Sequence, residues 1–180
     1  MAKPITIPAT HVALADKACR NLVAAFLKDF GPTTTASTLS RGDFTAVFHP
    51  DVHWYDHAFL ICRQGHDAVA GLQVAFRHAN QPFDVEIKAI TPTAKGAILE
   101  QVWVGRLSND IVRPDGQVVV KATGKDFRCH VCMVVEVDQD GLIRRIDEYY
   151  NKAWDDGVRE AEYVVMKGGS LKQRVVQTPL

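Results

Sequence analysis

The sequence predicts an α+β fold in which helices come first and an antiparallel sheet follows. Before Gln81, apolar residues recur every three or four positions, which is the period of an amphipathic helix. After Pro82 they alternate with polar residues, which is the period of a half-buried strand. Helices followed by a run of strands are typical of α+β proteins, and the chain shows neither a repeat nor a second domain.

Three helices are expected in the first part of the chain. The first covers residues 11–30, where apolar side chains keep helical spacing until Gly31-Pro32 stops the helix. The second is short, because it starts at the capping box of residues 40–43 and ends at His49-Pro50. The third opens at residues 65–67, and its apolar stripe consists of Val69, Leu72, Phe76 and Ala79.

Strands are expected from residue 52 onward. β-branched, aromatic or alternating segments predict them at residues 52–57, 83–89, 97–106, 117–122, 127–137 and 142–150. Asp140-Gly141 marks a hairpin turn between the last two. Residues 158–166 are expected to add a helix or an arm. A curved sheet of four to six strands, covered on one face by helices, encloses a cone that suits a small molecule.

Composition and charge argue against several classes of function. The chain carries 21 Lys and Arg against 21 Asp and Glu, interleaved along the sequence, so no basic surface for nucleic acid is predicted. No apolar run reaches the ~18–20 residues of a membrane span, and residues 1–10 resemble neither a signal nor a transit peptide. We therefore expect a cytoplasmic protein that binds neither nucleic acid nor membrane.

The four cysteines agree with a cytoplasmic setting, because they are too sparse for a secreted disulfide framework. Cys129 and Cys132 have the spacing of a zinc or redox motif. They lie in a predicted strand, however, where residues three apart point to opposite faces. We therefore expect two half-buried thiols rather than a disulfide or a shared metal.

Short segments along the chain carry a resemblance to a known family. They are residues 41–44, 48–52, 65–69, 140–143 and 148–150. Their order resembles the SnoaL-like branch of the nuclear transport factor 2-like superfamily, whose members include ketosteroid isomerase, scytalone dehydratase and limonene epoxide hydrolase. The resemblance implies a SnoaL-like domain at residues 12–156, an N-terminal arm at 1–11 and a C-terminal extension at 157–180.

This resemblance also implies an architecture. It is a cystatin-like α+β barrel, with three N-terminal helices packed on a strongly curved antiparallel or mixed sheet that forms a cone-shaped pocket. It does not name a reaction, because the superfamily contains isomerases, dehydratases, cyclases, hydrolases and non-catalytic binding domains.

Asp56 is the first candidate for a catalytic group. Ketosteroid isomerase has its general-base aspartate near the end of the first strand, and Asp56 occupies the similar place. A carboxylate at the mouth of an apolar cone is suited to take a proton from carbon and return it. The alternative is that Asp56 only caps the strand end beside His57.

The other face of the same strand offers a second catalytic set. His53, Tyr55 and His57 lie opposite Trp54 and Asp56, because side chains alternate along a strand. Only one of these sets can face the pocket. If the first set does, two imidazoles and a phenol line the cone, which resembles the chemistry of scytalone dehydratase in kind.

The face of the strand at residues 127–137 is also open. Counting back from Asp140-Gly141 puts Met133 where the isomerase has its second catalytic acid. A shift by one residue instead brings Arg128, His130 and Cys132 onto the cavity face. His130 is then the natural acid or base, because an imidazole titrates near neutral pH.

Further side chains are expected to bind substrate. Aromatic rings would stack on a ring-shaped substrate, a carboxylate would orient a histidine, and an arginine would stabilise an enolate. The predicted substrate-binding residues are Trp54, Trp103, Glu100, Arg128, Met133, Glu148 and Tyr149. No metal-ligand spacing and no glycine-rich phosphate loop is found, so neither a metal nor a cofactor is predicted.

The leading hypothesis is a cofactor-independent lyase, isomerase or cyclase. Its substrate would be a hydrophobic, oxygenated small molecule derived from a polyketide, terpenoid or phenylpropanoid. One alternative is a non-catalytic binding or dimerisation module of the same fold. Another is an epoxide hydrolase, which needs an Asp–Arg–Asp set of which Asp56 and Arg128 supply at most two members. A homodimer is expected, because residues 127–137 are predicted to be apolar on both faces.

Overall fold

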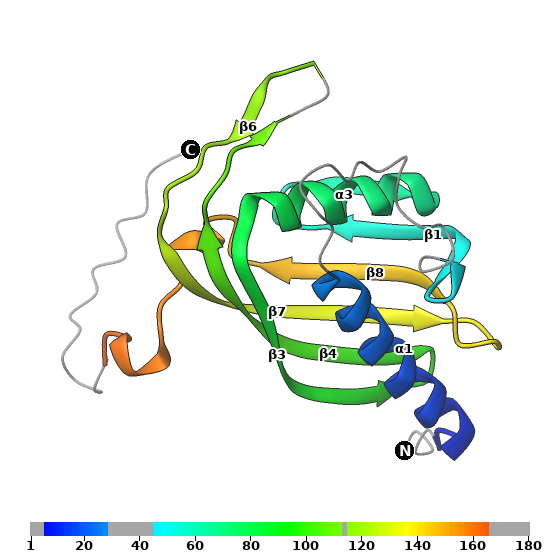
Figure 1. The fold of residues 1–180 in the computed structure, drawn as a ribbon. Helices are drawn as coiled ribbons and strands as arrows, with labels where there is room; N and C mark the ends of the chain where they lie inside the picture. Colours follow the sequence, from blue (N-terminus) through cyan, green and yellow to red (C-terminus); the bar gives the residue numbers. More distant parts are fainter. Residues whose placement is uncertain (1–5, 29–44, 113–114, 166–180) are drawn as a thin grey trace, which may run out of the picture.

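A computed structural model describes residues 6–28, 45–112 and 115–165 of the chain. Within these ranges, two α-helices lie on one face of a six-stranded sheet with the order β2-β1-β8-β7-β4-β3 (Figure 1). The strands are β1 (Phe48–Asp56), β2 (Ile61–Gln64), β3 (Asn80–Thr93), β4 (Gly96–Leu107), β7 (Asp126–Val137) and β8 (Ile143–Tyr150). Neighbouring strands are antiparallel except β1 and β8, which run parallel, so the sheet is mixed.

Two of the three predicted helices lie within the described residues. The first, α1 (Ala9–Leu27), and the third, α3 (Gly65–Ala79), form where helical periodicity predicts them. The second was predicted to start at residues 40–43, which lie outside the described residues. Its predicted end is wrong, because Phe48 already belongs to β1 and pairs with Ile143 of β8.

Several short elements differ from the predictions. The predicted strand at 117–122 is β6 (Val118–Val120), and it pairs only with β5 (Ile111–Val112) in a separate two-stranded sheet. The strand β2 was not predicted, because it is too short and too exposed to show a clear alternation. After η1 (Trp154–Asp156), the described part of the predicted C-terminal helix or arm holds a single 3₁₀ turn, η2 (Glu160–Glu162).

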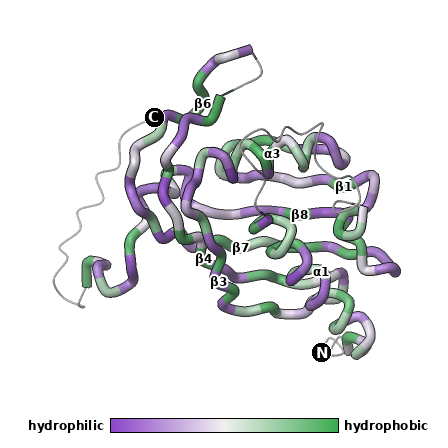
Figure 2. Tube along the Cα trace, in the orientation of Figure 1, coloured by the Kyte–Doolittle hydropathy of each residue, from purple (hydrophilic) through white to green (hydrophobic). Residues whose placement is uncertain are grey.

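The core lies between the helices and the inner face of the sheet. The helix α1 crosses β3, β4 and β7, whereas α3 lies along β1 (Figure 1). Along the strands beneath α1, hydrophobic residues alternate with hydrophilic ones (Figure 2). Phe26 of α1 is the centre of the core, because its ring lies within 6.1 Å of the rings of Trp54, Phe76, Phe83 and Trp103.

The outer face of β7 is more polar than expected. Its inward residues are apolar and buried, but its outward residues are Arg128, His130, Cys132, Val134 and Glu136. The expectation that residues 127–137 are apolar on both faces is therefore wrong. Among the described residues, none of the helices is both long and apolar enough to cross a membrane.

Two glycines provide a matched test of the packing. A side chain on Gly96 would collide with the backbone carbonyl of Val135 on the adjacent strand, whereas one on Gly71 in α3 would meet nothing within 4 Å. Gly96→Ala should therefore lower the free energy of unfolding by about 1–3 kcal/mol. Gly71→Ala should raise it by roughly 0.5–1 kcal/mol, because alanine favours a helix. Urea denaturation measures both, and a neutral Gly96→Ala would contradict the close approach of β4 and β7.

Candidate active site

The inner face of the sheet decides which predicted residues can act together. On β1, Val52, Trp54 and Asp56 point inward and are buried. On β8, the inward residues include Ile146, Glu148 and Tyr150. The parallel register of the two strands places Asp56 directly beside Glu148. Of the two sets on the first strand, Asp56 and Trp54 therefore face the interior.

Asp56 is held by three donors although its side chain is only 3% exposed. Its Oδ1 accepts a hydrogen bond from the backbone N–H of Phe59 at 3.0 Å. Its Oδ2 accepts one from the hydroxyl of Tyr150 at 3.2 Å and a longer one from Nη1 of Arg63 at 3.4 Å. A buried carboxylate needs such partners, so the arrangement suits an ionised Asp56.

Glu148 lies deeper than Asp56 and is 2% exposed. Its Oε2 accepts a hydrogen bond from the indole Nε1 of Trp54 at 3.0 Å, whereas its Oε1 is buried without a hydrogen-bond partner among the described residues. Burial, followed by the negative charge of Asp56, raises the pKa of Glu148 to about 8. At neutral pH this carboxyl is therefore mostly protonated, and the pair carries one negative charge.

Tyr150 keeps its proton in this environment. Burial raises the pKa of the Tyr150 hydroxyl far above its usual range, and the nearby carboxyls of Glu148 and Asp56 raise it further. The group is therefore a hydrogen-bond donor at any ordinary pH. Its ring lies 5.1 Å from the ring of Trp103, which keeps the phenol in place against the core.

A cavity of about 120 Å³ opens at this cluster. Asp56, Arg63 and Tyr150 form its polar wall, and the β1–β2 turn, α3, the β5–β6 hairpin and η1 supply the rest. The remaining lining is apolar or aromatic and includes Phe59, Ile61, Leu72, Phe76, Val120 and Trp154. An apolar cavity with a few convergent polar groups is the usual form of a small-molecule site.

The other predicted catalytic residues lie on the outer face of the sheet, away from this cavity. The rings of His53, Tyr55, His57 and Tyr149 form a ladder with centroid distances of 6.2, 6.4 and 4.5 Å. His57 also pairs with Asp147 at 3.0 Å. His53, Tyr55 and His57, the alternative set on this strand, therefore face away from the cavity, and Tyr149, a predicted substrate-binding residue, lies beside them.

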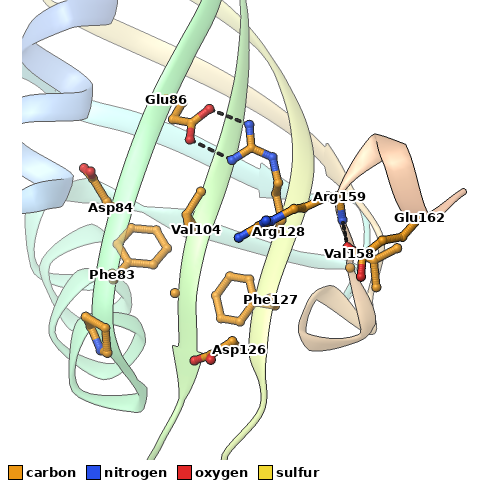
Figure 3. A pocket seen from close by; sticks show the side chains of 13 residues that line it. Phe83, Asp84, Glu86, Val104, Asp126, Phe127, Arg128, Val158, Arg159 and Glu162 are labelled. Atoms are coloured by element: carbon orange, nitrogen blue, oxygen red, sulfur yellow. Dashed lines mark hydrogen bonds and ion pairs between the residues drawn. The ribbon is translucent and has the colours of Figure 1, made fainter.

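His130 and two predicted substrate-binding residues also face outward. Arg128 forms a bidentate ion pair with Glu86 at 2.7 and 2.5 Å, which passes over β4 (Figure 3). His130 lies 3.4 Å from Glu160, and Glu100 is exposed. The one-residue shift that would have turned Arg128 and His130 inward is absent, because Met133 is the inward residue of β7.

Three further predicted residues are buried behind the cavity rather than in its wall. Trp54 contacts the site through Glu148, and Met133 lies opposite Glu148 across β7 and β8. Trp103 packs against the core rings, and its Nε1 is buried without a hydrogen-bond partner among the described residues. The position that the resemblance gives to a second catalytic acid thus carries Met133, and the residue paired with it on β8 is Glu148.

Sequence reasoning missed Arg63 as a site residue and did not choose Tyr150. Tyr150 had a signal, because it follows Glu148 by two positions and therefore shares its face, whereas Tyr149 does not. Arg63 pairs in register with Trp54 and so faces inward on β2. Its strand is too short for alternation to reveal this.

Larger recesses lie elsewhere, among them one of about 490 Å³ at the turn between β7 and β8. Another of about 730 Å³ separates the C-terminal segment from β3, β4 and β7, and its wall includes the ion pair of Glu86 with Arg128 (Figure 3). A third of about 440 Å³ on the outer face includes Glu100, His130, Cys132 and Tyr149. None of these three recesses is lined by a buried acid or base, so the smaller cavity, with the buried Asp56 in its wall, is the candidate active site.

The cysteines and possible metal ligands add no second centre. Cys129 points into the core and Cys132 points outward, and burial raises the pKa of both thiols, so neither is an activated thiolate. In residues 6–28, 45–112 and 115–165, no three His, Cys, Asp or Glu side chains gather closely enough to hold a metal ion.

Comparison with solved structures shows the same fold. A candidate SnoaL-like polyketide cyclase from Jannaschia sp. CCS1 superimposes with a TM-score of 0.63 at 9% identity, over 81% of this chain and 91% of that one. A protein with a ketosteroid isomerase-like fold from Catenulispora acidiphila, in complex with trimethylamine, gives 0.56 at 15% identity, over 83% and 90%. A candidate polyketide cyclase from Silicibacter sp. TM1040 gives 0.56 at 18% identity, over 83% and 98%.

At these identities the structural likeness establishes the fold alone. No protein with a curated description matches the chain in sequence. The model of the SnoaL-like domain matches residues 34–146, which is more than half of the 180 residues. The chain therefore belongs to the SnoaL-like domain family.

Proposed function

We propose that the chain is an acid/base enzyme that acts on a hydrophobic, oxygenated small molecule without a cofactor. The observation that carries the proposal is the Asp56 carboxylate. It is buried in the wall of an apolar cavity, with the hydroxyl of Tyr150 and the guanidinium of Arg63 as its partners. Lyase, isomerase and cyclase reactions share a first step that such a set performs.

In that step Asp56 takes a proton from a carbon next to a carbonyl. The C–H bond breaks, the proton bonds to a carboxylate oxygen, and the electron pair moves into an enolate. Tyr150 and Arg63, which line the cavity beside Asp56, are the donors that stabilise the developing enolate oxygen in this proposal. Return of the proton to another carbon gives isomerisation. Loss of a β-hydroxyl, which takes the proton from Asp56 and leaves as water, gives dehydration. Attack of the enolate carbon on a second carbonyl, whose oxygen takes the proton, gives cyclisation.

Glu148 supports this step without lining the cavity. Because it holds a proton at neutral pH, the two adjacent carboxyls do not repel each other, and the negative charge stays on Asp56. Its bond from Trp54 fixes its position beside Asp56. Glu148 is therefore a positioning residue in this proposal.

Epoxide hydrolysis is a second candidate, favoured by one specific observation. The expected partner of Asp56, Arg128, lies on the outer face. Arg63 takes its place and, with Glu148, completes a carboxylate–guanidinium–carboxyl set. Asp56 of this set can activate a water, whereas the acid that protonates the epoxide oxygen must line the cavity, as Tyr150 does and Glu148 does not. Formation of the diol from cyclohexene oxide would favour this reaction over enolisation.

Exchange of carbon-bound hydrogen tests the leading proposal without knowledge of the natural substrate. The wild-type chain should catalyse exchange of the α-hydrogens of cyclohexanone, 2-tetralone or 4-chromanone in D₂O, followed by proton NMR. Asp56→Asn should lower the catalysed rate by about 10²–10⁴-fold, because the general base is lost. Asp51→Asn, exposed on the same strand, is the matched control and should leave the rate unchanged.

Two outcomes would count against an enzyme. Unchanged exchange in Asp56→Asn would remove Asp56 from the reaction. Ketones that bind the wild-type chain but exchange no faster than in buffer would favour the alternative of a non-catalytic binding module.

The protonated state of Glu148 predicts a pH dependence of stability. The folded chain holds this proton up to about pH 8, whereas a free glutamate releases it near its ordinary pKa of 4.5. The contribution of the Glu148 carboxyl to the free energy of unfolding is therefore largest below about pH 4.5. It falls by on the order of a few kcal/mol as the pH rises toward 8. Glu148→Gln should flatten that fall in urea denaturation, whereas Glu100→Gln should not. Equal slopes in Glu148→Gln and wild type would contradict a buried proton.

We also propose that the partner of the outer face is a second copy of the chain. That face carries the half-buried Ile98 and Val134, which pair across β4 and β7. Val134 also pairs with Asp147, the partner of His57 in the ring ladder. Light scattering should give a molar mass close to twice the 19.9 kDa of one chain. A mass of one chain at micromolar concentration would contradict the dimer.

A further inference from the structure

The mouth of the candidate active site is surrounded by exposed apolar side chains. Leu60 and Ile61, in and after the β1–β2 turn, are 88% and 43% exposed. Val112, Val118 and Val119 of the β5–β6 hairpin are 47%, 47% and 45% exposed. We call these five residues the rim.

The two halves of the rim belong to one surface. Ile61 and Val119 come from different elements, yet both line the same cavity while nearly half of each side chain is open to solvent. Leu60 and Val118 are their chain neighbours, and Val112 pairs with Val118 across the hairpin. The rim therefore adjoins the cavity opening through Ile61 and Val119. Single exposed apolar residues are ordinary, but a continuous group at a cavity mouth marks a binding surface.

Backbone strain at the rim supports a role in binding. Leu60 has a φ of 58°, the one non-glycine residue with positive φ among the described residues. Asparagine or glycine would adopt this conformation more readily, and leucine gains nothing from burial here because its side chain is almost fully exposed. An apolar side chain held in a strained conformation and in solvent is explained by a ligand that covers it.

The hairpin points to the same conclusion. β5 and β6 hydrogen-bond only to each other, and the hairpin projects beyond the main sheet on the α3 side (Figure 1). An isolated two-stranded hairpin is marginally stable in water, and its exposed valines add to the cost. Through Ile111, Val119 and Val120 its inner side forms one wall of the cavity.

The cavity itself is too small for a whole ligand of the usual size. Its volume of about 120 Å³ is well below the ~300–1,000 Å³ of typical ligand pockets. It holds the reacting part of a molecule beside Asp56, and the remainder must lie outside. The surface next to the opening is the rim, whose five members carry no charge.

We propose that the ligand of this site has a small oxygenated head, which enters the cavity, and an uncharged apolar tail, which lies on the rim between Leu60 and Val119. The inference rests on the proposed function for the identity of the head, but the tail is argued from the rim alone. The substrate class is then a molecule longer than the cavity, such as an alkyl or alkenyl ketone.

A series of straight-chain ketones tests the proposal by binding alone. The probes are 2-butanone to 2-decanone, titrated against the full chain by calorimetry, with tryptophan fluorescence as a second readout because Trp154 lies in the cavity wall. Full burial of a methylene strengthens binding by about threefold to fourfold, and half-burial on a rim by about twofold. Affinity should therefore keep rising by about twofold per methylene through the longest ketones.

The variants remove the rim without disturbing the fold. Leu60→Asn keeps a residue that tolerates positive φ, and Val118→Thr changes a rim residue that does not line the cavity and keeps a β-branched residue in the strand. The double variant should bind 2-butanone as the wild type does but lose most of the gain for 2-decanone. Val164→Thr makes the same chemical change at an exposed valine of the C-terminal segment and should change neither affinity.

Each outcome decides one proposal. An affinity that stops rising after the shortest ketones, or a double variant that binds 2-decanone as tightly as wild type, overturns the tail site. A double variant that is monomeric where the wild type is dimeric also overturns it, because the rim is then a contact between copies. Chain-length dependence without hydrogen exchange overturns the proposed reaction and leaves the tail site standing. Hydrogen exchange without chain-length dependence overturns the tail site and leaves the proposed reaction standing.

Discussion

The parallel pairing of β1 with β8 is the constraint on which the site depends. It joins residues more than ninety positions apart in the chain and sets Asp56 beside Glu148 in a fixed register. Side chains alternate between the two faces of a strand, so a slip by one residue would replace this pair with groups of the outer face. The hydrogen bond from Trp54 to Glu148 and that from Tyr150 to Asp56 both link β1 to β8, and they hold the register at the point where the chemistry is proposed.

Two carboxyls in an apolar interior can share a site only when their charge is limited. Asp56 receives three hydrogen bonds and lies at the cavity, whereas Glu148 is deeper and receives one. The number of hydrogen bonds separates their roles. The carboxyl that receives more hydrogen bonds carries the charge, and the one that receives fewer keeps the proton. Arg63 then balances the remaining charge from the short edge strand β2.

Sequence patterns predicted much of this arrangement. They failed where the alternation along a strand is compatible with either face pointing inward. The fold class, two helices and most strands follow from periods of 3.6 and two residues, and Asp56 was placed at the end of the first strand by resemblance. Period two alone does not say which face is inward, so the outer ring ladder of His53, Tyr55 and His57 remained an equal alternative until the register was known. The choice of Tyr149 over Tyr150 is the same error by one position. Arg63 needed the pairing of β2 with Trp54, which no local pattern contains.

The bond from the Phe59 N–H to Asp56 couples the two ends of the site. One carboxylate oxygen fixes the turn that presents Leu60, while the other faces Tyr150 and Arg63. When Asp56 accepts a proton it becomes a weaker acceptor, so the turn is held less firmly during the reaction than before it. Any contact that orders the turn at Leu60 therefore also orders the Asp56 carboxylate through this hydrogen bond. Occupation of the entrance and readiness of the base are therefore linked through a single side chain.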